Sequence, residues 1–198
     1  MPSSLLALAL ALCLGAVPHA AGARVYYSKS EALASAFPGA DQVESRTVVL
    51  KDELAAAIES LAKARLESRL ITIYTGVKDD GIVGYAFIDI HTVRTLPEAF
   101  LIVLSPDGHV SSLRLLAFYE PSEYKPSERF LAQFDARALD PELRLGGAIH
   151  GIAGASLSSR AVTTSVRRSL ALYQVLVRDG SGAIELGSTP APGAAGGR

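Results

Sequence analysis

The 198-residue sequence contains a single cysteine, Cys13, which lies inside an apolar run near the N-terminus. Leu5 to Leu14 is almost entirely Leu and Ala, and Ala21-Gly22-Ala23 has the small-x-small pattern that a signal peptidase accepts. We therefore predict a signal peptide over residues 1–23, cleaved before Arg24. The mature chain would then have no thiol, which excludes disulfides, cysteine zinc sites, iron–sulfur clusters and c-type haem attachment.

The apolar run is too short to span a bilayer comfortably, so we expect the leader to be removed rather than kept as a membrane anchor. No Lys or Arg precedes the run. We therefore expect either that the N-terminal amine alone supplies the positive charge or that the true start lies upstream. The predicted location of the mature protein is outside the cytoplasm, in the periplasm or secreted.

The sequence also lacks an excess of charge of either sign, with 19 basic and 20 acidic residues. A nucleic-acid-binding surface needs a basic stripe, usually interleaved with aromatic residues, whereas the Lys and Arg here are scattered among acidic neighbours. We therefore expect no nucleic-acid partner. Any redox chemistry is expected to come from a bound organic cofactor, because the mature chain offers no cysteine for it.

The predicted mature domain, residues 24–180, has the length of a single domain and contains both helical and strand patterns. Helices are predicted over Glu31–Phe37 after a Ser28 capping box, from an Asp52 cap to Ala64, over Ser127–Phe134 and over Arg160–Val177. Strands are predicted over Thr47–Leu50, Leu70–Tyr74, Ile82–Ile90, Phe100–Leu104 and Val110–Phe118. The last four strands follow one another across turn signals, which favours an antiparallel meander over a parallel nucleotide-binding sheet. We predict an α+β fold in which a twisted antiparallel sheet packs against helices, followed by a disordered tail over 181–198.

The most informative segment is the small, hydroxyl-rich stretch Gly151–Ser159, which leads into the last predicted helix. A glycine and alanine loop before a helix presents unpaired backbone N–H groups and the positive end of the helix dipole, which together favour a phosphate. Gly154 and Ala155 are small enough for the backbone to approach a bulky ligand. Three serines add hydroxyl donors: Ser156, Ser158 and Ser159. The segment predicts a C-terminal loop-to-helix cofactor site, and the alternative is that one of the last two serines only caps the helix.

The segment AGASLSSRAV (Ala153–Val162), leading into Val166–Leu172, resembles the FMN-binding domain family. That family includes the flavin-carrying domains of the C subunit of the sodium-translocating NADH:quinone reductase and of the G subunit of the Rnf electron-transport complex. The resemblance covers about Tyr27 to Tyr173 and is closest to exported single-domain members. It also takes in three shorter segments, Gly84–Phe87, His91–Glu98 and Glu120–Tyr124.

The family motif reads Asp-x-x-Ser/Thr-Gly-Ala-Thr, and in many members a dedicated flavin transferase joins the Thr to the FMN phosphate. The resemblance places Ser156 at the acceptor position, whereas His150 replaces the Asp and Ala153 replaces the Ser or Thr. Because the transferase reads that Asp, we predict non-covalent FMN. Covalent FMN at Ser156 is the first alternative, and a domain without flavin is the second.

The resemblance implies an electron-transfer flavoprotein rather than a stand-alone enzyme. Its implied partners are a redox protein, either soluble or membrane-bound, and for the covalent form a flavin transferase. The alternative function is a flavin-free binding or accessory module on the same fold.

The predicted FMN-binding residues are His91, Arg94, His150, Gly154, Ala155, Ser156, Leu157, Ser158 and Ser159. The alternatives are that the two histidines are ordinary surface or loop residues and that Arg94 forms an exposed ion pair with Glu98. Tyr85 and Phe87 share one strand face and either stack on the flavin ring or belong to the core. Arg167 and Arg168 are expected on a solvated helix face.

A serine hydrolase is the other enzyme class to weigh, because Gly154–Ser158 is one residue short of Gly-x-Ser-x-Gly. A nucleophile elbow follows a strand of a parallel sheet, and its acid and its histidine come later in the chain. No histidine follows Ser156. The usual order of a hydrolase triad is therefore impossible.

Overall fold

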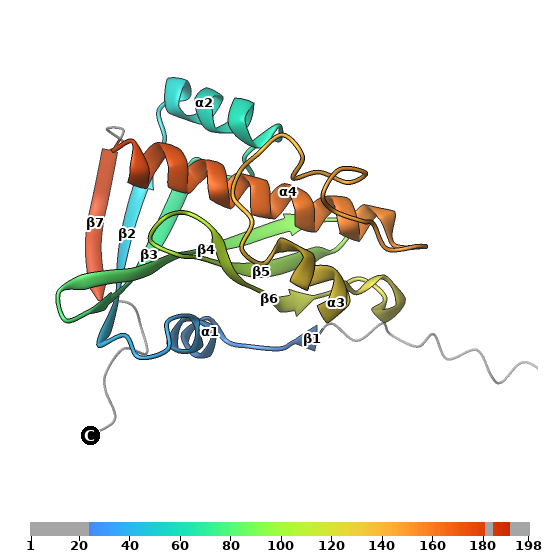
Figure 1. The fold of residues 1–198 in the computed structure, drawn as a ribbon, viewed down its shortest axis with the longest axis horizontal. Coiled ribbons are helices and arrows are strands. Elements are labelled where there is room, and N and C mark those ends of the chain that lie inside the picture. Colours follow the sequence, from blue (N-terminus) through green and yellow to red (C-terminus); the bar gives the residue numbers. More distant parts are fainter. Residues whose placement is uncertain (1–23, 181–183, 191–198) are drawn as a thin grey trace, which may run out of the picture.

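The computed structural model describes residues 24–180 and 184–190. An open antiparallel sheet of seven strands forms the centre of the domain, in the order β1-β6-β5-β4-β3-β2-β7 (Figure 1). The strands are β1 (Arg24–Val25), β2 (Gln42–Val49), β3 (Leu70–Lys78), β4 (Gly81–Thr92), β5 (Pro97–Leu104), β6 (Val110–Phe118) and β7 (Ile184–Pro190). Strands β2 to β6 pair in chain order, so the predicted α+β fold with an antiparallel meander is confirmed.

Helices cover both faces of this sheet. They are α1 (Lys29–Ala36), α2 (Asp52–Ala62), α3 (Glu128–Leu131) and α4 (Ser156–Tyr173), with the 3-10 turns η1 (Ser122–Tyr124) and η2 (Ala132–Phe134) and the π-helical turn η3 (Gln174–Arg178). Helices α2 and α4 lie on one face and α1 on the other (Figure 1). Within the two described ranges, no helix has the length and apolar character needed to cross a membrane.

The interior strand β5 is buried on both faces and separates two hydrophobic cores. Phe100, Ile102 and Leu104 pack into the core beneath α2 and α4, whereas Leu101 and Val103 pack into the core beneath α1. Side chains alternate across a strand, so a slip of one residue would exchange these two sets. The near-continuous apolar run of β5 therefore fixes the register of β5 in the sheet against which α4 packs.

The predicted turns between the meander strands are present. Asp79 and Asp80, with φ of 48° and 61°, have the two positive φ values of a tight two-residue hairpin turn between β3 and β4. Gly108, between β5 and β6, has a φ of +84°, and a Cβ there would lie 2.3 Å from a ring carbon of Tyr173. The Tyr173 hydroxyl donates to the Pro106 carbonyl at 2.7 Å. This turn consequently holds the C-terminal end of α4.

The first two helices show one cap as predicted and one that differs. The capping box of α1 is present, because Ser28 Oγ accepts from the Glu31 N–H and Glu31 Oε2 accepts from the Ser28 N–H. The predicted N-cap Asp52 is instead the first residue of α2, and Lys51 is its N-cap. The Asp52 carboxylate accepts from Arg69 at 2.8 Å, so it is engaged with a side chain rather than with the helix backbone.

Two boundaries near the C-terminus also differ from prediction. Helix α4 begins at Ser156, before the predicted start at Arg160. Strand β7 pairs with β2, although disorder is the expectation for 181–198, so that expectation does not hold for 184–190. The predicted signal peptide, 1–23, and the remainder of the tail lie outside the described residues.

Candidate functional site

The loop before α4 and the first turn of the helix form one wall of a pocket of about 180 Å³. The residues around this α4 N-terminal pocket are Arg94, Glu120, Tyr124, Gly154, Ala155, Ser156, Leu157 and Ser158. Six of the nine predicted FMN-binding residues therefore lie around one cavity, although Arg94 is distant from the others in sequence.

The backbone at this pocket has the geometry of an anion site. Gly154 has a φ of +80°, which glycine adopts without strain, and a Cβ at this position would meet no atom within 4 Å. The conformation rather than crowding therefore favours glycine here. Ala155 is the N-cap of α4, and no side-chain hydrogen bond caps the helix. The first-turn N–H groups lack helical acceptors, and they lie at this pocket with the positive end of the helix dipole.

Ser159 supports the loop from behind instead of lining the pocket. Its Oγ accepts from the Ile152 N–H at 2.9 Å and donates to the Ala155 carbonyl at 2.9 Å. Ser158 is also buried, but it does line the pocket. Neither serine is the N-cap, so the alternative in which one of them only caps α4 is wrong.

Arg94 reaches the pocket from the loop between β4 and β5. Glu120 Oε1 accepts backbone N–H bonds from Arg94, Thr95 and Leu96 at 3.1, 3.0 and 3.0 Å. Burial opposes the charged form of Glu120, but these three bonds and the nearby Arg94 charge lower the pKa of its carboxyl group. The Arg94 guanidinium lies 5.5 Å from the centre of the Tyr124 ring. The loop is thus held by an ionised carboxylate and presents an exposed cation.

His91 lies elsewhere, in a buried polar cluster between the sheet and α4. Its Nδ1 lies 2.7 Å from Asp89 Oδ1, and its Nε2 lies 2.7 Å from Glu98 Oε1. Ser165 donates its hydroxyl to Asp89 at 2.8 Å, and Arg168 donates to both oxygens of Asp89 at 2.8 and 2.9 Å. We call these five residues the Asp89–His91–Glu98 cluster. Glu98 is fully buried and bonded to His91, so the predicted alternative of an exposed Arg94–Glu98 ion pair is wrong.

The cluster holds His91 in its protonated form. Carboxylates only accept hydrogen bonds, so a ring that faces one on each side donates from both nitrogens. Burial opposes this charge, but the hydrogen bonds to Asp89 and Glu98 outweigh it and raise the pKa of His91 to about 9. Burial raises the pKa of Glu98, whose Oε2 is buried and has no hydrogen-bond partner in the part of the chain that the structure describes. The cluster therefore joins α4 to the sheet, and His91 does not line the α4 N-terminal pocket.

His150, which replaces the motif Asp, is exposed and lies outside the pocket. Its backbone N–H donates to the Gln133 side chain at 2.8 Å, and its carbonyl accepts from the same side chain at 3.0 Å. The structure therefore fixes the backbone of His150 and leaves its ring in solvent.

The two consecutive arginines of α4 do not lie on a solvated face, as the sequence suggests. Arg167 and Arg168 are only 9% and 3% exposed. Arg168 is paired with Asp89 and Glu67, whereas Arg167 donates to backbone carbonyls of α2 and of the loop after α3. The prediction fails because α2 and this loop supply acceptors for Arg167, whereas β4 and the segment after α2 supply them for Arg168.

Tyr85 and Phe87 follow the core alternative. Phe87 is buried in the core beneath α4, and Tyr85 packs against the ring of Tyr173 at a centroid distance of 5.5 Å. Neither residue lines the α4 N-terminal pocket, so neither is placed to stack on a ligand there.

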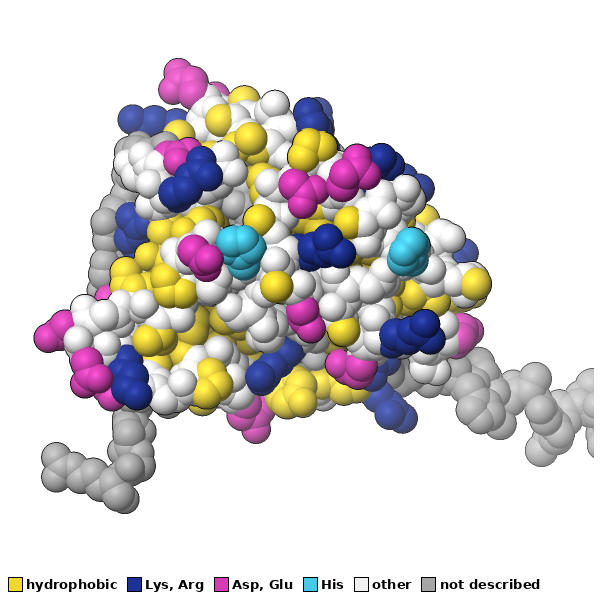
Figure 2. Space-filling view, in the orientation of Figure 1, with side chains coloured by type: hydrophobic (Ala, Val, Ile, Leu, Met, Phe, Trp, Pro, Cys, Tyr) yellow, Lys and Arg dark blue, Asp and Glu magenta, His cyan; other side chains and the backbone are white. Residues whose placement is uncertain are grey.

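Charges on the face that carries α4 are mixed, with basic and acidic side chains interspersed (Figure 2). Within residues 24–180 and 184–190, no group of three His, Cys, Asp or Glu side chains is arranged to hold a metal ion. In comparisons with known proteins, neither a family model nor a curated protein matches the chain.

Proposed function

We propose that this protein is an exported electron-transfer flavoprotein that binds FMN with the phosphate at the N-terminus of α4. The observation that carries the proposal is the convergence of Arg94 with the uncapped first turn of α4 on one pocket. Backbone N–H groups at a helix N-terminus and an arginine are two of the commonest partners of a protein-bound phosphate. The resemblance of Ala153–Val162 to the FMN-binding domain family supports FMN as the phosphate-bearing ligand.

The size of the pocket decides which part of FMN it holds. A volume of about 180 Å³ accommodates a phosphate and the start of the ribityl chain, whereas complete ligand pockets span about 300–1,000 Å³. We therefore place the isoalloxazine ring over the rim. Leu157 lines the pocket and is 50% exposed, and Leu96 follows the Arg94 loop and is 38% exposed. These two side chains and the Tyr124 ring offer apolar surface for a planar aromatic group.

Glu120 determines how the ligand is oriented. Its ionised carboxylate repels a phosphate, so the phosphate binds on the side of Arg94 and the helix N-terminus. Because Oε1 already accepts three N–H bonds, Oε2 is the atom left to accept from a ribityl hydroxyl. In this orientation the phosphate contacts Arg94 and a ribityl hydroxyl donates to the Glu120 carboxylate.

Non-covalent binding is the form that we propose, with covalent attachment at Ser156 as the alternative. Ser156 is exposed at the first position of α4, where its hydroxyl is accessible to a transferase. His150 and Ala153 replace two residues of the motif that such a transferase reads. The flavin supplies the electron-transfer chemistry when bound, and the residues of this chain bind the phosphate and position the ring for a redox partner, either soluble or membrane-bound.

The test is a visible spectrum and an intact mass of the mature protein co-expressed with a flavin transferase, before and after acid precipitation. We expect a yellow protein that releases FMN into the supernatant. Colour that stays with the precipitate, with the added mass of FMN less water, would place the flavin covalently, and Ser156→Ala is the control. A colourless protein that takes up no FMN on reconstitution would contradict the proposal.

A flavin-free binding or accessory module is the second candidate function. The replacements at His150 and Ala153 favour it, because both fall inside the segment that carries the resemblance. Saturable FMN binding at micromolar concentration would exclude this candidate, whereas capture of a partner by colourless protein would support it.

A further inference from the structure

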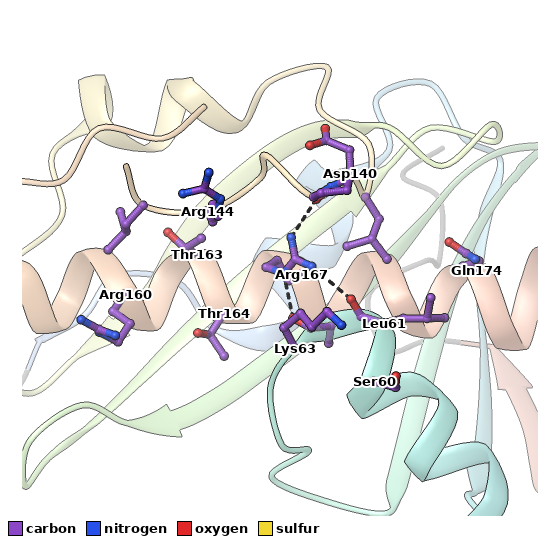
Figure 3. A pocket seen from close by; sticks show the side chains of 14 residues that line it. Ser60, Leu61, Lys63, Asp140, Arg144, Arg160, Thr163, Thr164, Arg167 and Gln174 are labelled. Carbon is purple, nitrogen blue, oxygen red and sulfur yellow. Dashed lines mark hydrogen bonds between the residues drawn. The ribbon is translucent and has the colours of Figure 1, made fainter. Parts of the chain in front are cut away.

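A second cavity, of about 830 Å³, lies between the end of α2, the middle of α4 and the loop that follows α3 (Figure 3). It shares no lining residue with the α4 N-terminal pocket. Its volume is within the range of pockets that enclose drug-sized ligands. We call it the α2–α4 cavity.

The side chains around the α2–α4 cavity carry an excess of positive charge. Its four basic residues are Lys63, Arg144, Arg160 and Arg167, and its one acidic residue is Asp140. Oδ1 of Asp140 accepts the N–H groups of Glu142 and Leu143 at 2.7 and 2.9 Å, so this carboxylate is engaged with its own loop. The balanced charge of the whole chain makes this local excess distinctive.

Arg167 lies in the centre of the cavity lining (Figure 3), and its hydrogen bonds within the described ranges all go to backbone carbonyls. Its Nε donates to the Ala62 carbonyl at 2.7 Å, its Nη1 to Asp140 and Leu143 carbonyls at 2.9 Å each, and its Nη2 to the Leu61 carbonyl at 3.1 Å. A guanidinium has five N–H donors, so these four bonds leave one. Burial lowers the pKa of Arg167, and the nearby Asp140 carboxylate acts in the opposite direction.

The adjacent Arg168 is also buried, but unlike Arg167 it forms ion pairs with carboxylates. Arg168 is paired with Asp89 and with Glu67 at 2.8 and 2.7 Å. Arg167, one residue earlier, is hydrogen-bonded only to backbone carbonyls, which solvate its charge without cancelling it, and the Asp140 carboxylate attracts it without an ion-pair contact. The positive field of Arg167 therefore extends into the α2–α4 cavity.

Two further cations at the cavity have no protein partner within the described ranges. The side chains of Lys63 and Arg160 are exposed, and neither forms a hydrogen bond or ion pair with another described residue. Arg144 differs, because it contacts the Glu142 carboxylate at 3.3 Å. Lys63 and Arg160 are consequently the groups that an incoming anion meets first.

The rest of the lining suits a ligand with an apolar body. Four side chains supply aliphatic surface: Leu61, Leu139, Pro141 and Leu145. Hydroxyl and amide groups elsewhere in the lining come from Ser60, Thr163, Thr164 and Gln174. An inorganic anion alone would leave this aliphatic surface wet, whereas an amphipathic anion covers it.

We infer that the α2–α4 cavity binds a small organic anion, attracted by the positive charges of Lys63, Arg160 and Arg167 and with its apolar body against the leucines. The negative end of the α2 dipole opposes an anion, but Arg167 already bonds the Leu61 and Ala62 carbonyls there. The site is separate from the flavin site that we propose and does not depend on it.

The experiment uses 8-anilinonaphthalene-1-sulfonate, an aromatic sulfonate that fluoresces in apolar surroundings, titrated into the purified protein. N-phenyl-1-naphthylamine, which has the same aromatic body without the sulfonate, is the neutral control probe. The test variant is Lys63→Gln with Arg160→Gln, and the matched control is Arg129→Gln, which changes an exposed arginine outside the cavity. All changed side chains are exposed, so the variants are expected to fold.

We expect saturable binding of the sulfonate, weakened about tenfold or more in the double variant and unchanged in Arg129→Gln. Binding of the neutral probe should be weaker than that of the sulfonate and should not respond to the double variant. A Thr164→Phe variant, which fills the cavity and keeps all four cations, should also weaken binding of the sulfonate.

Equal sulfonate affinity in wild type and double variant, or no saturable binding, would overturn the inference. Displacement of the sulfonate by FMN would also overturn it, because the cavity would then belong to the flavin site.

Discussion

Arg167 and Arg168 illustrate how neighbouring residues of the same type can be buried in different ways. Arginine is mostly exposed in proteins, and the sequence around these two offers no local reason to bury them. In the structure one is neutralised by carboxylates and the other is solvated by carbonyl groups from α2 and from the loop after α3. Their burial depends on residues distant in sequence, and for that reason the pattern of the helix alone does not predict it.

His91 has a local signal that points inward. Side chains two apart on a strand share a face, and Phe87, Asp89 and His91 are spaced in this way along β4. Phe87 is a core residue, so the same face carries His91 towards α4. Applying this alternation to the whole strand would have placed His91 inside the domain rather than at the cofactor.

The Asp89–His91–Glu98 cluster predicts how stability depends on pH. The folded pKa of His91, about 9, lies above its ordinary value of 6.5. Its stabilising contribution is therefore fully present below about pH 6.5 and is lost as the pH rises through about 9. The raised pKa of Glu98 acts in the same direction, starting above its ordinary value of 4.5.

We expect His91→Gln to lower the free energy of unfolding by about 3 kcal/mol at pH 6, because it removes the cation between two buried carboxylates. The variant should also lose most of the decline in stability between pH 6.5 and 9. Urea denaturation at a series of pH values measures both effects. His150→Gln, at an exposed histidine, is the control and should behave as wild type. A pH profile that is the same in His91→Gln and wild type would contradict the assignment.

At the scale of elements, hairpins and the first helix cap follow from short-range signals. The Asp79–Asp80 turn and the Ser28 capping box involve residues within three positions of each other, so the sequence specifies them locally. The edge strands β1 and β7 depend instead on pairing with β6 and β2. Nothing local distinguishes such segments from irregular chain, so the sequence pattern does not predict them as strands.

The start of α4 combines both kinds of signal. The glycine and serine content of Gly151–Ser159 is typical of a loop, which placed the predicted helix start at Arg160. The buried Ser159 side chain forms hydrogen bonds with the Ile152 N–H and the Ala155 carbonyl. These bonds hold the loop against the first turn, so the helix begins at Ser156. The motif therefore predicts five residues of the pocket lining correctly, whereas the start that it predicts for the helix lies four residues after the observed one.

Ser159 and Ser156 form a matched pair for testing this account of the loop. Ser159→Ala removes the acceptor of the partly buried Ile152 N–H, so we expect a loss of about 1–3 kcal/mol in the free energy of unfolding. Ser156 is exposed, so Ser156→Ala should change stability by less than about 0.5 kcal/mol. Chemical denaturation without flavin measures both values. Equal values for the two variants would mean that the Ser159 bonds do not support the loop.

Over the whole molecule, α4 is the element that connects the two proposed sites. Its first turn lies at the α4 N-terminal pocket, its middle is held to β4 through Asp89, and its end is held to the β5–β6 turn through Tyr173. The α2–α4 cavity lies along the same helix. Held at two points along its length, α4 provides a rigid support for a phosphate at its N-terminal end, which is what precise positioning of a bound group requires.

The most direct test of the central claim compares FMN with riboflavin, which lacks the phosphate, in fluorescence titrations of protein produced without a flavin transferase. If the phosphate binds at Arg94 and the first turn of α4, wild type should bind FMN about tenfold or more tightly than riboflavin. Arg94→Gln should remove most of that preference, and Arg129→Gln should preserve it. Equal affinity for FMN and riboflavin, or an unchanged preference in Arg94→Gln, would contradict the proposed site.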